Sequence, residues 1–255
     1  MRVLCAALLL LASAAPARAA PSNEEAPERA ALDRAAWAFV FWSQAVTDEA
    51  ARLGLPAPAI RTRYRPEAPA AGALNLLGTA GPGAVQILLE GDGWQRQSAS
   101  AERILARNAA HEAAHLYQHA KGDPFEPQWL HEGFADAMAF AAMDARGEAG
   151  AWAGGQRCAG ALRRDTLRAR FAGGDPDALY DCSSLLIRAV AAARDESPRA
   201  LYDAVVAGGR TEAAFMRLAA EAGPAWSRTA RAFLSRDWTN ADPFWVIRTM
   251  RAGGL

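Results

Sequence analysis

The residues most able to do chemistry form the short motif HEAAH, from His111 to His115. On an α-helix, residues four apart lie on one face a single turn from each other, so His111 and His115 can reach the same metal ion. Glu112 lies beside them and can take a proton from a water molecule without binding the metal itself. The motif also arises by chance in unrelated chains, so its interpretation depends on a second segment.

That second segment is WLHEGFADAMAF, in which Glu132 lies 17 residues after His115. Aromatic and small residues recur there at helical spacing, which predicts a packed helix with Glu132 near its start. A catalytic zinc site uses three protein ligands and keeps one position open, and a carboxylate from a neighbouring antiparallel helix completes such a set. The alternative, a solvated surface acid, fits poorly beside the apolar neighbours. We therefore predict one Zn²⁺ ion held by His111, His115 and Glu132, with Glu112 as general base.

The two motifs together resemble those of the gluzincin metallopeptidases, the group that includes thermolysin and aminopeptidase N. HEAAH matches their helix motif, and WLHEGFAD is similar to the aminopeptidase pattern Trp-Leu-Asn-Glu-Gly-Phe-Ala, whose Glu is the third zinc ligand. His131 stands where that pattern has Asn, and the interval from His115 to Glu132 is two residues shorter than in the aminopeptidases. The resemblance covers about residues 100 to 195 and implies a zincin-type active-site helix and hydrolysis of peptide bonds.

The resemblance also implies roles for two further residues. Asp136 matches the acid that accepts a hydrogen bond from the first zinc histidine, here His111. Tyr180 opens YDCSSLLIRAV, which is similar to the aminopeptidase stretch that begins with the tyrosine stabilising the oxyanion. The Lys-Gly pair that follows in the aminopeptidases is replaced by Cys182 and Ser, which leaves Tyr117 or a purely structural tyrosine as alternatives. His119 lies one further turn along the helix, and we expect a polar neighbour or a surface residue there, not a ligand.

A substrate-binding strand is expected upstream of the helix motif. GAVQILLEG lies where the family places an edge strand that pairs with extended substrate, and this implies that role for Ala84, Val85, Gln86 and Ile87. The aminopeptidases carry an acidic Gly-Ala-Met-Glu-Asn motif near this place, whose acid binds the substrate amino terminus. Because Val85 and Gln86 follow Gly-Ala here, that anchor is missing. The sequence therefore favours an endopeptidase over an aminopeptidase.

Charge and motif content narrow the classes of partner. Lys+Arg and Asp+Glu each total 28 in a chain of 255 residues, which gives no electrostatic reason to expect a nucleic acid. We expect a peptide or protein substrate, and the oligomeric state stays open. Two other functions remain: a non-catalytic zinc- or peptide-binding protein of the same fold, and a helical exported protein without a metal.

The first 19 residues resemble a signal peptide. One Arg precedes a short apolar run, and Ala17, Arg18 and Ala19 form the small-x-small pattern before the expected cleavage point. The run is much shorter than the roughly 20 residues that span a bilayer, so we expect an exported protein, periplasmic or secreted, with no membrane span. Cys158 and Cys182 would remain after cleavage. In an oxidising compartment, an even pair indicates a disulfide closing a loop of about 25 residues, with two buried free thiols as the alternative.

The pattern of elements predicts one α+β domain over residues 20 to 255, mostly helical, with a small N-terminal β-sheet. Apolar spacing predicts a first helix over about 27 to 53, and Pro and Gly then punctuate about three strands between 56 and 93. A helix capped by Ser98 or Ser100 and ending near Ala120, followed by one over about 127 to 146, would carry the ligands. Further helices are expected at 157–171, 178–194, 198–207, 211–222 and 224–235. The late aromatic residues are interpreted as packing residues: Trp226, Trp238, Phe244 and Trp245.

Overall fold

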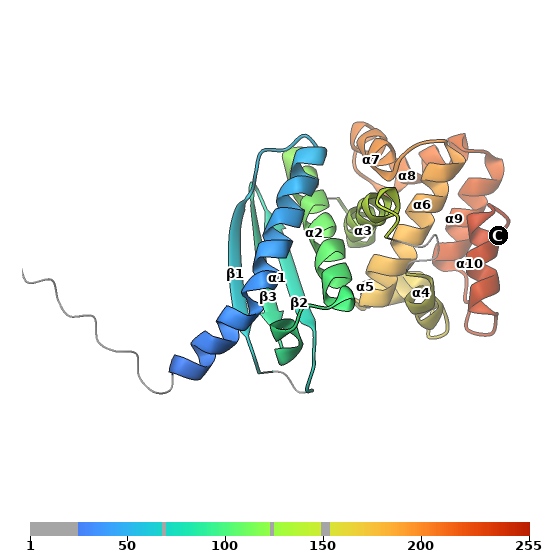
Figure 1. The fold of residues 1–255 in the computed structure, drawn as a ribbon. Helices are drawn as coiled ribbons and strands as arrows, with labels where there is room; N and C mark the ends of the chain where they lie inside the picture. The colour runs from blue at the N-terminus through green and yellow to red at the C-terminus, as the bar shows by residue number, and fades with distance from the viewer. Residues whose placement is uncertain (1–24, 68–69, 123–124, 149–153) are drawn as a thin grey trace, which may run out of the picture.

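The computed structural model describes residues 25–67, 70–122, 125–148 and 154–255 (Figure 1). The expected signal peptide at 1–19 lies outside the described residues. The described chain is a mostly helical α+β structure with one small three-stranded sheet, as the sequence predicts. Within these residues, no helix combines the length and the apolar character needed to cross a bilayer.

The sheet has the strand order β1-β3-β2. Its strands are β1 (Ala59–Arg65), β2 (Asn75–Gly81) and β3 (Ala84–Glu90). A two-residue turn of Pro82 and Gly83 joins β2 to β3 in antiparallel pairing, and Gly83 supplies the positive φ of 70° that such a turn requires. β1 pairs with β3 in parallel.

The prediction that residues 84 to 87 form an edge strand for the substrate is therefore wrong. Residues 84 to 87 belong to β3, the central strand, whose backbone groups are shared between both neighbouring strands. The apolar alternation that made this segment look like a strand also buries Val85, Ile87 and Leu89 in the core, which suits a central position. The free edge beside the helical part of the molecule belongs to β2.

Two long helices cover the buried face of the sheet. They are α1 (Glu25–Arg52), which precedes β1, and α2 (Ala99–Ala120), which follows β3 after the short η1 (Asp92–Gln95). Trp42 and Val46 of α1 share a buried apolar cluster with Leu105 and Ala109 of α2 and with the inward residues of β3. Ser98 caps α2, because its side chain accepts a hydrogen bond from the backbone N–H of Ala101.

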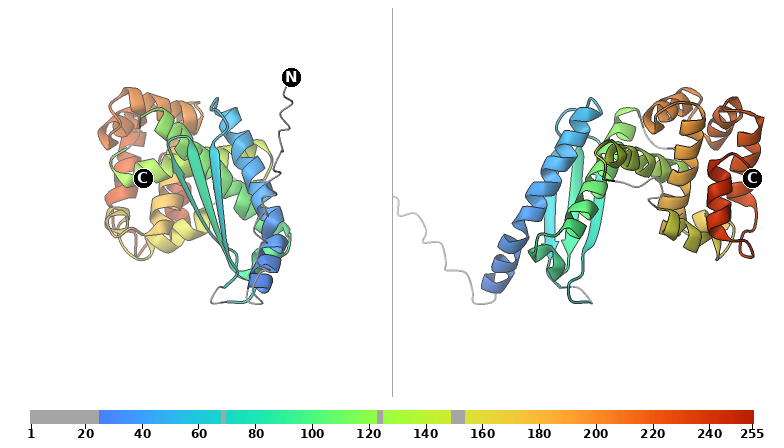
Figure 2. Two further views of the ribbon diagram at one scale, coloured as in Figure 1. Left: turned by 90° about the vertical axis from the view of Figure 1, so that its left-hand side faces the viewer. Right: turned by 45° about the vertical axis from the view of Figure 1, so that its right-hand side comes forward.

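The long helix α2 lies between the sheet and a helical body that begins with α3 (Gln128–Ala145), as Figure 1 and Figure 2 show. Ala109 and Ala113 pack toward the sheet, whereas Ala114 and Tyr117 pack into the core of the helical body. Apolar residues thus occupy two faces of α2. The polar motif HEAAH lies where these two packed faces meet.

The rest of the helical body differs in part from expectation. It consists of α4 (Gly155–Leu162), α5 (Leu167–Ala172), a π-helical turn η2 (Asp177–Cys182), α6 (Ser183–Ala193), α7 (Pro198–Ala207), α8 (Glu212–Glu221), α9 (Pro224–Ser235) and α10 (Pro243–Arg251). The single helix expected at 157–171 is two, because Thr166 leaves the helical conformation to cap α5. The helix α10 was not predicted.

The late aromatic residues are also corrected in part. Trp238 is buried and Trp226 packs against the core, as expected. Phe244 and Trp245 are 40% and 48% exposed, so their interpretation as packing residues is wrong. The helix α10 instead buries Pro243, Val246, Ile247 and Met250, because the helical repeat turns the two aromatic rings outward.

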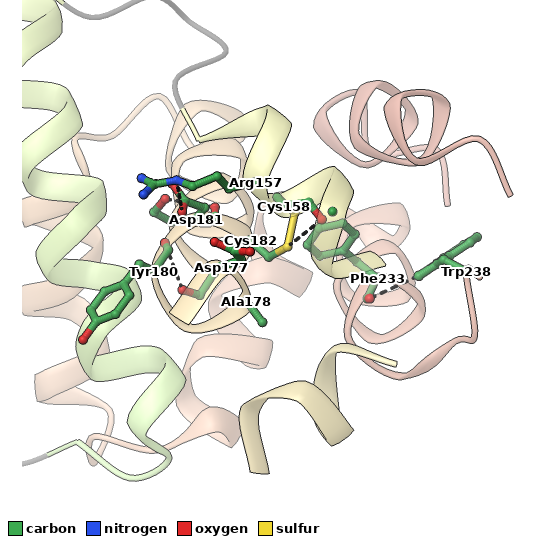
Figure 3. The surroundings of a disulfide bond; sticks show 12 residues. Arg157, Cys158, Asp177, Ala178, Tyr180, Asp181, Cys182, Phe233 and Trp238 are labelled. Carbon is green, nitrogen blue, oxygen red and sulfur yellow. Dashed lines mark hydrogen bonds and ion pairs between the residues drawn. A yellow bond between two sulfur atoms is a disulfide. The ribbon is translucent and has the colours of Figure 1, made fainter. Parts of the chain in front are cut away.

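A disulfide joins Cys158 of α4 to Cys182 at the end of η2 (Figure 3). The bond fixes η2 against α4. Figure 3 shows Tyr180 and Asp181 on the turn just before the bridge, with Arg157 beside Cys158.

Candidate metal centre

Three side chains from two helices converge on one point. Nε2 of His111 lies 2.9 Å from Nε2 of His115, and Oε2 of Glu132 lies 3.5 Å and 3.3 Å from these two nitrogens. Donor atoms about 2.0–2.1 Å from a zinc ion in tetrahedral geometry lie about 3.3–3.4 Å from one another. The spacing, and the two-imidazole, one-carboxylate donor set, therefore fit a zinc ion.

The first histidine is held by an acid from α3. Nδ1 of His111 lies 2.9 Å from Oδ1 of Asp136, which is buried one turn beyond Glu132. Since the carboxylate only accepts, Nδ1 donates, and Nε2 is the ring nitrogen that faces the ligand cluster. The structure thus places Asp136 where the family resemblance implies.

The second histidine is held differently, by an amide. Nδ1 of His115 lies 2.6 Å from Oε1 of Gln118, and Nε2 of Gln118 donates to the backbone oxygen of His131 at 2.8 Å. The ring of His131 stacks on that of His115, with centroids 4.6 Å apart. His119 lies away from the ligands, with its Nε2 3.2 Å from the backbone oxygen of Ala80, so it is a polar neighbour as expected.

The candidate base is oriented by a hydrogen-bond chain from α1. The indole N–H of Trp42 donates to Oδ1 of Asn108 at 2.8 Å, and Nδ2 of Asn108 donates to Oε1 of Glu112 at 3.3 Å. Glu112 is 2% exposed, and among the described residues no group donates a hydrogen bond to its Oε2. A buried carboxylate oxygen left without a donor is costly unless something else meets it. A general base needs a carboxylate oxygen that is available to a catalytic water, and Oε2 of Glu112 meets this requirement.

Tyr180 lines the cleft beside the ligands. Its ring meets that of His111 edge to face, with centroids 5.6 Å apart, and Figure 3 shows its hydroxyl projecting away from the disulfide. Tyr117, the alternative, is 3% exposed and donates its hydroxyl to the carboxylate of Asp203 at 2.8 Å. The geometry therefore favours Tyr180 as the phenol available to a substrate.

Two hollows flank the ligands. One, of about 650 Å³, is lined by His111, Glu112 and Tyr180 together with residues 74–78. The other, of about 730 Å³, is lined by residues 125–128, His131, Glu132 and Glu212. An extended peptide that crosses the candidate ligands would therefore have room on both sides of them.

The strand β2 offers backbone groups to the first hollow. The N–H of Ala59 donates to the backbone oxygen of Gly83, so the odd-numbered residues of β3 direct their backbone N–H and C=O groups toward β1. The even-numbered residues of β3 therefore form the hydrogen bonds to β2. Leu76 and Gly78 face Leu89 and Ile87 in the register, and their own N–H and C=O groups therefore point to the open edge. Residues 74–78 line the cleft, so this edge is the one available to an extended peptide.

The charges of the site are strongly coupled. Burial lowers the pKa of His111, but hydrogen bonds to Asp136 and Glu132 outweigh it and raise that pKa to about 10. Burial opposes ionisation of Glu132, yet the two histidines lower its pKa. Burial raises the pKa of Glu112, and burial with the surrounding acids raises that of Tyr180 to about 12. The phenol of Tyr180 therefore stays protonated and able to donate at neutral pH.

Behind the candidate ligands runs a series of ion pairs, in which the two carboxylates are buried and Arg157 is exposed. Nη2 of Arg107 lies 2.6 Å from Oδ2 of Asp136 and 3.5 Å from Oδ1 of Asp181, whose other oxygen lies 2.9 Å from Nε of Arg157. Arg157 and Asp181 each directly precede a cysteine of the disulfide. The series therefore connects His111, through Asp136, to the disulfide-linked part of the helical body.

Four residues of the site were missed by the sequence analysis: Arg107, Asn108, Gln118 and Asp181. The first three had a usable signal, since Arg107, Asn108 and Gln118 lie one turn from His111, Glu112 and His115 on the same helix. Asp181 had none, because only the fold brings η2 beside α2.

Comparison with protein-family models, curated proteins and solved structures gives no match to this chain.

Proposed function

We propose that this chain is an exported zinc-dependent peptidase of the gluzincin type that cleaves internal bonds of extended peptides. The observation that carries the proposal is the convergence of His111, His115 and Glu132 beside a buried glutamate oxygen with no hydrogen-bond donor among the described residues. A bound zinc ion would supply Lewis acidity toward a water molecule and a substrate carbonyl.

The chain's own residues then carry out the proton transfers. Oε2 of Glu112 takes a proton from the attacking water, while Asn108 holds the other oxygen of the same carboxylate. The raised pKa of Glu112 suits a group that must hold this proton and then release it to the departing amine. The hydroxyl of Tyr180 donates to the carbonyl oxygen of the scissile bond as that oxygen gains negative charge.

Substrate binding follows from the strand edge and the two hollows. The open backbone groups of Leu76 and Gly78 suit an extended chain lying along β2. Space on both sides of the ligands accommodates residues before and after the scissile bond. These features support an endopeptidase over an enzyme that removes terminal residues.

The test combines metal analysis with hydrolysis. The purified protein should contain one zinc per chain and digest a peptide library, a chelator should abolish digestion, and zinc should restore it. Glu112→Gln should keep the zinc and lose hydrolysis, whereas the matched control Glu102→Gln, at the start of the same helix, should retain both. One zinc per chain without digestion would favour a non-catalytic binding protein, and a lack of zinc would favour a protein without a metal.

A further inference from the structure

We infer that Gln118 is a positioning residue that fixes both the second histidine ligand and the start of the helix carrying the third ligand. The inference rests on the proposed metal centre. It concerns a side chain that neither motif includes, three residues after His115 on α2.

The orientation of the Gln118 amide is determined by its surroundings. The backbone oxygen of His131 can only accept, so the group 2.8 Å away from it must be the amide nitrogen of Gln118. The amide oxygen then faces Nδ1 of His115 at 2.6 Å, and an oxygen without a hydrogen requires that Nδ1 donate. The tautomer of His115 with its lone pair on Nε2, toward Glu132 and His111, follows.

Burial makes this arrangement energetically significant. The side chain of Gln118 is 0% exposed, and a buried amide without partners is strongly disfavoured. Here the amide oxygen has Nδ1 of His115 on α2 as its partner, and one amide hydrogen has the backbone oxygen of His131 on α3. No rotation of the amide could satisfy both partners in another way, so Gln118 restricts the ring of His115 to one orientation.

The second bond of Gln118 acts on the third ligand. His131 directly precedes Glu132, so the bond from the Gln118 amide to its backbone oxygen fixes the first turn of α3 against α2. The stacking of the His131 ring on His115 reinforces the same alignment. Gln118 is therefore the one side chain among the described residues seen to bond to both the ring of His115 and the backbone next to Glu132.

The two histidines consequently have partners of different charge. His111 donates to the carboxylate of Asp136, whereas His115 donates to a neutral amide. A carboxylate in place of the Gln118 amide would add one more negative charge beside Glu132 and Glu112, at a buried position. A neutral acceptor orients His115 without that cost.

The experiment compares Gln118→Met with the wild-type protein. Methionine has nearly the same shape but neither hydrogen bond, and we expect the zinc affinity, measured by competition with a chelator, to fall about 10–100-fold. Gln97→Met, the same change at an exposed position just before α2, is the matched control and should leave the affinity unchanged. An unchanged zinc affinity in a folded Gln118→Met protein would overturn the inference.

A spectroscopic measurement on the unmodified protein keeps the test decisive if the variant does not fold. Nitrogen-15 NMR should show His115 protonated at Nδ1 in both the metal-free and the zinc-loaded protein, with His111 as the internal reference. A His115 ring unprotonated at Nδ1 would overturn the inference. Because the metal-free measurement does not depend on zinc or hydrolysis, failure of the proposed function and failure of this inference remain distinguishable.

Discussion

Gly78 of β2 lies directly against Glu112 of α2, so closely that no side chain fits between them. A Cβ built at Gly78 would lie 2.7 Å from both terminal atoms of the Asn108 amide and closer still to Oε1 of Glu112. The contact brings the open edge of β2 next to the candidate base. A peptide lying along that edge would therefore pass the carboxylate that must receive the proton.

The first prediction concerns this contact. Gly78→Ala should push Asn108 and Glu112 out of place and lower the hydrolysis rate about 100-fold, because small displacements of a catalytic group are costly. Zinc content should be unchanged, since neither residue is a ligand. Gly81→Ala, on the same strand with open space around it, is the matched control. Equal hydrolysis rates in the two variants would show that the contact has no catalytic role.

The second prediction concerns the hydrogen bond from His111 to Asp136. Asp136→Asn removes the negative charge that orients the ring and also deprives Arg107 of its closest partner. We expect the zinc affinity, measured by chelator competition, to fall about 10–100-fold. Asp144→Asn, an exposed acid on the same helix, should bind zinc as the wild type does. Wild-type affinity in Asp136→Asn would mean that Asp136 is only a structural ion-pair partner.

The third prediction separates the two candidate tyrosines. Tyr180→Phe keeps the ring contact with His111 but removes the hydroxyl, so kcat should fall about 100-fold or more while zinc affinity stays unchanged. Tyr117→Phe should leave kcat unchanged, because its hydroxyl is bonded to Asp203. The reverse pattern of kcat values would assign the role to Tyr117.

What the sequence could and could not predict follows from how local each feature is. The spacing of His111 and His115 is a property of one helix, and the apolar residues around Glu132 made its position at the edge of the core predictable. The order of the three strands depends on pairing between distant segments, so the most apolar strand was mistaken for the edge when its burial in fact makes it central. Asp181 reaches the site only through the packing of η2, which no local pattern reveals.

The last prediction uses the pH dependence of stability at Asp181. Burial raises the pKa of Asp181 to about 6, although Arg107 and Arg157 act to lower it. The unfolded chain releases this proton near pH 4, so the folded protein binds more protons between about pH 4 and pH 6. The contribution of Asp181 to the free energy of unfolding is therefore fully present below pH 4. It is lost as the pH rises through 6, by at most about 3 kcal/mol.

Asp181→Asn removes this titration while keeping the shape of the side chain. The free energy of unfolding of the wild type minus that of the variant, from denaturant titrations, should decline between pH 4 and pH 7. The same difference measured with Asp33→Asn, at an exposed position on α1, should stay constant over this pH range. A difference that instead grew with pH would mean that the two arginines outweigh burial and hold Asp181 ionised throughout. In that case the ion-pair series behind His111 would stay fully charged even in acid, and the disulfide-linked turn would be anchored to the candidate metal centre by charge at every pH in this range.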